Sequence, residues 1–125
     1  MTATNALRRK NGNNVDVTLS AAVSFGDVLV VNGWLGISPE AAASGDTLAL
    51  NVEDAEFDII LPTSLSLTIG TEVYVTIANI TGNTVNTSNG FSTSSGAGKR
   101  RLGRCTTNQD GTTGQVRLIT TLRNQ

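Results

Sequence analysis

An acidic cluster is the first group of residues in this chain whose types and spacing could support chemistry. It consists of Glu53, Asp54, Glu56 and Asp58. Closely spaced carboxylates can bind calcium, but a calcium loop also needs carbonyl ligands and a glycine at its turn. No glycine lies between Glu53 and Asp58, and the segment leads into a predicted strand. We therefore expect no metal and no other cofactor, and interpret the acidic cluster as a solvated or partner-facing edge.

A basic cluster, Lys99, Arg100, Arg101 and Arg104, could contact nucleic acid or serve as a localisation signal. An oligonucleotide-binding β-barrel would combine such a basic groove with aromatic side chains on which bases stack. The chain has one Trp, one Tyr and three Phe, which are scattered along it, and its pI is about 5.2. The glycines before Lys99 also lack the full spacing of a phosphate-binding loop. We expect no nucleic acid as a partner and interpret the basic cluster as an edge that contacts protein.

The residues most often used in enzyme active sites are scarce in this chain. It has no histidine, which excludes Ser-His-Asp and Cys-His arrangements and most zinc sites. Cys105 is the single cysteine, so no disulfide can form within the chain. We interpret Cys105 as a small core or near-surface residue rather than a nucleophile. The sequence therefore does not predict an enzyme.

The net charge of −1 hides a segregation of charge along the chain. Residues 1–15 carry three bases and no acid, residues 16–72 carry nine acids and no base, and residues 73–125 carry six bases and one acid. Two interpretations stay open. The two halves can neutralise each other inside one fold, or acidic and basic surfaces can meet across subunits, where complementarity sets partner choice and register.

Short alternating runs, separated by Gly, Thr, Ser and Asn, predict strands rather than helices. The predicted strands cover 15–19, 27–31, 34–37, 47–51, 56–60, 72–77, 84–86, 101–106 and 116–122. Asn32-Gly33 predicts a type I′ turn, because both positions of that turn need a positive φ angle. Residues 38–44 could be a loop or one helical turn. In the last strand, Val116, Leu118, Thr120 and Leu122 are predicted to share one face.

The chain length of 125 residues favours a single domain with one core. Eight or nine short strands at this spacing predict an all-β barrel or sandwich over residues 15–125. Residues 1–14 lack the alternation and are interpreted as a flexible N-terminal arm, and 87–98 as an exposed loop. No apolar run approaches the ~20 residues of a membrane span, and no apolar stretch follows Arg8, Arg9 and Lys10 as in a signal peptide. We expect a soluble protein made in a cytoplasm, with no membrane partner.

The order of several short motifs carries a family resemblance. The motifs are Gly26–Val31 (GDVLVV), Gly33–Ile37 (GWLGI), Glu40–Asp46 (EAAASGD), Leu61-Pro62, Ile69–Val75 (IGTEVYV), Arg101–Arg104 (RLGR), Asp110-Gly111 and Gln115–Leu118 (QVRL). This succession, over about residues 15–122, resembles the capsid decoration or cement proteins of tailed phages. The chain departs from the pattern in its basic arm, in the long 87–98 loop and in Lys99-Arg100-Arg101.

The resemblance implies a small β-barrel-like or β-tulip-like subunit on the outer capsid surface of a virion. Such proteins generally bridge subunits of the major capsid protein and stabilise the shell, often as homotrimers at local threefold positions. No catalytic residues come with this family, so none are transferred to the chain. The host cytoplasm is then the expected place of synthesis.

Two sets of contacts are expected if the resemblance holds. A threefold ring joins copies head to tail, so the acidic cluster of one subunit can meet the basic cluster of the next. In the arm, Leu7 can lie in a groove of a capsid subunit while Arg8, Arg9 and Lys10 meet acids, or the arm can add a strand to a sheet edge. The alternatives left open are a tail, baseplate or head-fibre component and an oligonucleotide-binding-fold domain that binds nucleic acid.

Overall fold

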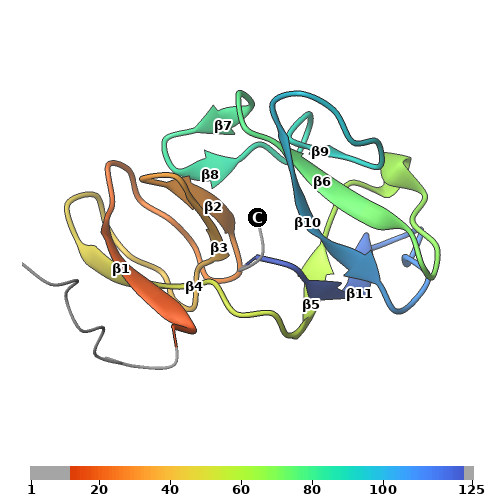
Figure 1. The fold of residues 1–125 in the computed structure, drawn as a ribbon, viewed down its shortest axis with the longest axis horizontal. Coiled ribbons are helices and arrows are strands. Elements are labelled where there is room, and N and C mark those ends of the chain that lie inside the picture. Colours follow the sequence, from red (N-terminus) through yellow and green to blue (C-terminus); the bar gives the residue numbers. More distant parts are fainter. Residues whose placement is uncertain (1–11, 123–125) are drawn as a thin grey trace, which may run out of the picture.

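Two antiparallel sheets make up the fold in the computed structural model, which describes residues 12–122 (Figure 1). The first sheet contains, in spatial order, β1 (Asn14–Thr18), β4 (Thr47–Asn51), β3 (Trp34–Ile37), β2 (Val28–Val31), β8 (Thr84–Val85) and β7 (Ile80–Thr81). The second contains β5 (Glu56–Ile60), β11 (Gln115–Thr120), β10 (Lys99–Cys105), β6 (Glu72–Thr76) and β9 (Phe91–Ser92). A single 3-10 turn, η1 (Thr63–Leu65), follows β5. The all-β prediction is confirmed.

The sheets do not close into a barrel, which corrects the barrel-like part of the prediction. Strands β3 and β4 pair only at Ile37 and Asn51, so the β1–β4 pair diverges from the β2–β3 hairpin. The apolar residues of the first sheet can then be buried between these two pairs and against the second sheet. A single closed core is not needed to cover them.

The described residues form eleven strands, whereas the sequence predicted eight or nine. The two missed strands, β7 and β9, have two residues each, too few to show alternation, whereas the equally short β8 lies within the predicted range 84–86. Strand β9 lies within the segment predicted to be an exposed loop, where it pairs with β6. Residues 38–44 form a loop rather than a helical turn, and Ala42 makes an isolated bridge with Val23.

The predicted turn at Asn32-Gly33 is confirmed. Val31 lies opposite Trp34, and the two residues between them have φ angles of 51° and 82°. Both values are positive, as a type I′ turn requires, and the turn sets the register of the β2–β3 hairpin.

Two apolar cores lie on opposite faces of strand β2. Val28 belongs to the larger core, where it meets buried residues of the second sheet such as Val73 and Leu118. Leu29 and Val31 belong to the smaller core, which is enclosed by residues of β1, β4 and the loop after β1. Because successive side chains of a strand point to opposite faces, β2 is buried on both sides.

The last strand has the predicted orientation: Val116, Leu118, Thr120 and Leu122 are all buried. Within the described residues, no helix is long and apolar enough to cross a membrane.

Candidate interaction surfaces

The acidic cluster lies along the connection from β4 to β5 and on β5 itself, at one edge of the second sheet. Thr120, which is fully buried, holds this connection in place: its hydroxyl donates to the Glu53 carbonyl at 2.8 Å and accepts from the Ala55 N–H at 3.0 Å. The Glu53 carboxylate accepts from Asn51, and the Glu56 carboxylate accepts from the Thr106 hydroxyl at 2.8 Å. Neutral donors thus position these two acids through hydrogen bonds.

The basic cluster lies on β10. Lys99 donates to the Ser92 hydroxyl and the Ser94 carbonyl, and Arg100 donates to the Gly33 carbonyl at 2.7 Å. The Arg100 contact connects the second sheet to the turn of the β2–β3 hairpin. Neither contact supplies a negative charge, so both side chains keep their positive charge available to an acid.

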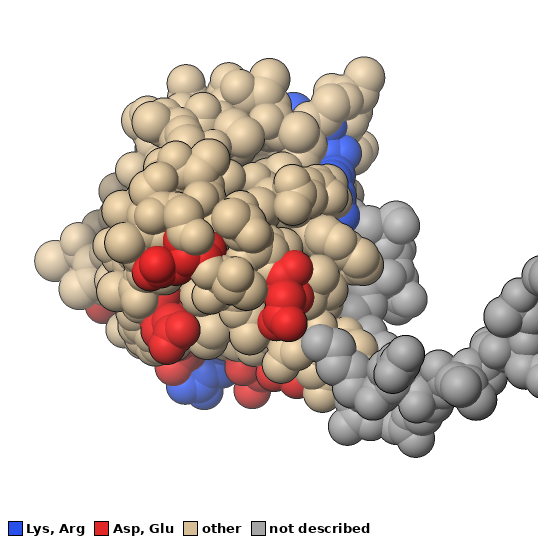
Figure 2. All heavy atoms as spheres, turned by 90° about the vertical axis from the view of Figure 1, so that its left-hand side faces the viewer, with Lys and Arg blue, Asp and Glu red and all other residues tan. Residues whose placement is uncertain are grey.

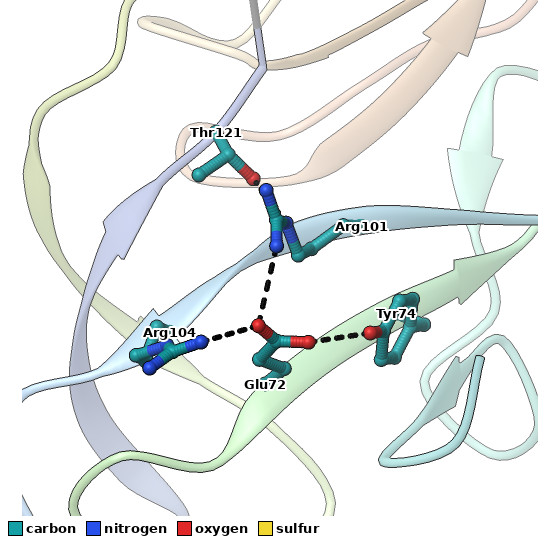
Figure 3. Close-up of polar contacts among 5 residues, drawn as sticks. All are labelled: Glu72, Tyr74, Arg101, Arg104 and Thr121. Atoms are coloured by element: carbon teal, nitrogen blue, oxygen red, sulfur yellow. Dashed lines mark hydrogen bonds and ion pairs between the residues drawn. The ribbon is translucent and has the colours of Figure 1, made fainter. Parts of the chain in front are cut away.

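Glu72 on β6 is the centre of a polar network on the outer face of the second sheet (Figure 3). One of its carboxylate oxygens accepts from Arg104 at 2.5 Å and from Arg101 at 3.2 Å, and the other accepts from the Tyr74 hydroxyl at 2.5 Å. Arg101 also donates to the Thr121 hydroxyl. The Tyr74 hydrogen bond, followed by that of Arg104 and the charge of Arg101, lowers the pKa of Glu72 from 4.5 to about 2.

Strand register explains how these residues meet. Glu72 lies opposite Arg104, Arg104 lies opposite Ile119, and Ile119 lies opposite Glu56. The four side chains therefore form one row across β6, β10, β11 and β5. In the neighbouring row Arg117 lies opposite Asp58, and the two make an ion pair at 2.8 Å that lowers the pKa of Asp58.

An apolar hollow lies within this charged outer face. Ile119 is 47% exposed, and Glu72, Arg101 and Arg104 surround it. The hollow has a volume of about 340 Å³. Gly103, which has no side chain, forms part of its floor. An apolar centre with a charged rim is typical of the surfaces through which protein subunits associate.

The two charge blocks thus meet within one subunit at two points, Asp58 with Arg117 and Glu72 with Arg101 and Arg104. Strand β11 lies between β5, which carries Glu56 and Asp58 of the acidic cluster, and β10, which carries the basic cluster. None of these three ion pairs joins a member of the acidic cluster to a member of the basic cluster.

The end of the molecule formed by β1–β4 is acidic. Asp16, Asp27, Glu40 and Asp46 lie in this part, and no base occurs between residues 12 and 98. Asp27 and Asp46 accept backbone N–H groups three residues earlier, from Ser24 and Ala43. Figure 2 shows this end, with acidic side chains on the face and basic side chains only at its margins.

Leu7, Arg8, Arg9 and Lys10, the predicted capsid-binding residues, lie outside the described residues. Sequence reasoning missed the parts played by Glu72, Tyr74 and Ile119. Period-two alternation could have placed each on an outer face, but only the register shows that they are neighbours. Within the described part of the chain, no group of three His, Cys, Asp or Glu residues could hold a metal ion.

A comparison with protein families gives a match over most of the chain. A family model described as phage cement protein matches residues 9–118. No curated protein and no solved structure matches the chain. The matched range covers all eleven strands apart from the last two residues of β11. The match confirms the resemblance carried by the sequence motifs.

Proposed function

The chain belongs to the phage cement protein family, and from this premise we propose that it binds the outside of a phage head and bridges neighbouring subunits of the major capsid protein. The family match over residues 9–118 is the observation that carries the proposal. The family itself consists of structural proteins of the phage capsid. Bridging stabilises a shell because a ligand that binds only the assembled state shifts the equilibrium toward that state.

The head-binding proposal is tested by sedimentation. Purified protein is mixed with undecorated phage heads, and the expected result is saturable co-sedimentation together with a higher melting temperature of the heads. A variant lacking residues 2–11 should bind more weakly, because the proposal assigns Leu7, Arg8, Arg9 and Lys10 to the capsid contact. Heads that sediment without the full-length protein, or protein that binds isolated tails instead, would contradict the proposal.

Copies of the chain are proposed to associate as a trimer through the outer face of the second sheet. Support comes from the exposed Ile119 with its charged rim, and from Glu56, Lys99 and Arg100, whose charges no ion pair in the described structure balances. In a head-to-tail ring one patch meets a different patch of the neighbour, which suits acidic β5 and basic β10. Exposed charge pairs contribute only ~0.2–1 kcal/mol each, so apolar contact at Ile119 would supply more of the affinity.

Ile119→Asp tests the trimer. Burying an isoleucine contributes about 1.5–3 kcal/mol, so the variant should raise the dissociation constant by roughly tenfold or more. Size-exclusion chromatography with light scattering measures the mass as a function of concentration. Ile69→Asp is the control, because Ile69 is 66% exposed and lies outside this face. A wild-type protein that is monomeric at all concentrations, or an Ile119→Asp protein that stays trimeric, would refute the assignment.

A further inference from the structure

An apolar groove of about 250 Å³ lies where the two sheets meet. Its walls come from the first sheet and its loops through Phe25, Ile37 and Pro39, and from β5 through Phe57 and Ile59. Phe25 is 77% exposed, the highest value among the large apolar residues described. Pro39 is also exposed and Phe57 is half-buried, whereas Ile37 and Ile59 are buried at the base of the groove. Single exposed apolar residues are ordinary, but exposed apolar walls of one groove indicate a binding surface.

The charge around the groove restricts what can bind there. Asp58 lies in its lining, and Asp27, Glu40 and Glu56 are the sequence neighbours of Gly26, Pro39 and Phe57, which also line it. Asp58 makes an ion pair with Arg117, but no basic residue is part of the groove lining. A matching occupant therefore combines an apolar side chain with adjacent positive charges.

The N-terminal segment of this chain has that composition, and the described residues that follow it lie beside the groove. Leu7 is followed directly by Arg8, Arg9 and Lys10. At the other end of the segment, the Asn13 carbonyl accepts from the Val52 N–H at 2.9 Å, and Asn14 lies opposite Asn51. Asn51 is itself part of the groove wall.

Chain length allows Leu7 to reach the groove of its own subunit. Leu7 lies six positions before Asn13, and an extended chain over six positions spans up to roughly 20 Å. A short tether also gives an effective concentration of about millimolar, so at micromolar protein an intramolecular contact prevails over the same contact between two copies.

We propose that the groove binds the N-terminal segment of its own subunit, with Leu7 between Phe25 and Phe57 and with the three basic residues beside Asp27, Glu40 and Glu56. The groove is thus an arm-binding site in the free protein. This inference does not depend on head binding, because it concerns the subunit before it meets a capsid.

Disulfide trapping in the full-length protein tests the proposal. The double variant Ala6→Cys/Pro39→Cys keeps Leu7 and places one thiol on the arm and one at the exposed rim of the groove. The matched control is Ala6→Cys/Ser95→Cys, since Ser95 is exposed and lies outside the groove. Cys105 is buried and stays in place, and peptide mapping by mass spectrometry identifies which thiols have joined. Both pairs are oxidised at micromolar protein in low salt.

The expected result is a disulfide within one chain that forms about tenfold faster for the Pro39 pair than for the control pair. Replacing Arg8, Arg9 and Lys10 by Gln in the Pro39 pair should slow trapping, as should 0.5 M salt, because both weaken the charge contacts. Equal trapping rates for the two pairs would overturn the proposal. So would disulfides only between two chains, which would assign the groove to the arm of a second copy.

Discussion

Glu72 brings together side chains from two strands that the sequence separates by about thirty residues. Its carboxylate accepts from Tyr74, Arg104 and Arg101, and this set of donors favours the ionised form. Because the pKa of Glu72 is about 2 in the folded state, below its ordinary value, ionisation of this carboxyl group stabilises the folded protein.

Glu72→Gln should lower the stability at pH 7, because the neutral amide loses the charge-assisted contacts. The difference from the wild type should be complete above about pH 4.5 and be lost as the pH falls through about 2, where Glu72 of the folded wild type becomes protonated. Urea unfolding from pH 2 to pH 7 measures it. Glu40→Gln, which changes an exposed acid outside the network, is the control. A difference that does not depend on pH would show that Glu72 acts through shape alone.

Strand β10 changes its register at Leu102, between Arg101 and Gly103. The bulge allows Leu102 to be fully buried while Arg101 and Arg104 both reach Glu72 on the outer face. Gly103 lies close to the backbone of β11: a Cβ atom added there would be 2.3 Å from the Ile119 carbonyl oxygen. Position 103 therefore needs glycine because the backbone of β11 is too close for a side chain, and not because of a special φ angle.

Gly103→Ala should destabilise the protein by roughly 1–3 kcal/mol, because the methyl group would push the two strands apart. Thermal and urea unfolding measure the loss. Gly111→Ala is the matched control, since an added Cβ there meets nothing within 4 Å. The control should be neutral or slightly stabilising, because alanine restricts the unfolded chain more than glycine does. Equal effects of the two substitutions would refute this account of the bulge.

The whole molecule is organised around β2, which contributes to both cores. Val28 packs against the second sheet, while Leu29 and Val31 pack inside the first. Neither core can be exposed without loosening this strand, so the two halves should unfold together.

Leu50→Ala in the smaller core and Leu118→Ala in the larger core test this coupling. Both side chains are completely buried, and each truncation should cost about 2–5 kcal/mol. Differential scanning calorimetry should show one transition for the wild type, and both variants should move that same transition. Two separate transitions, each moved by only one of the substitutions, would show that the cores are independent.

Local patterns in the sequence predicted the strands that are long enough to alternate. The predicted ranges at 34–37, 47–51 and 56–60 coincide with β3, β4 and β5, and the Asn32-Gly33 turn forms as expected. Strands β7 and β9 were missed, since two residues cannot show a period; β8, which is equally short, was predicted as part of the longer range 84–86. The buried face of the last strand was also predictable, since period two follows directly from backbone geometry.

Long-range features needed the tertiary structure. The sequence predicted which residues are charged and roughly which face each occupies, and it carried the family resemblance. It left open whether the acidic and basic blocks meet inside one subunit or across two. Strand order decides that question for two acids. Strand β5 pairs with β11, which brings Asp58 to Arg117. Strand β6 pairs with β10, which brings Glu72 to Arg101 and Arg104. Pairing of strands distant in the chain depends on how the apolar faces pack, and no local pattern encodes it.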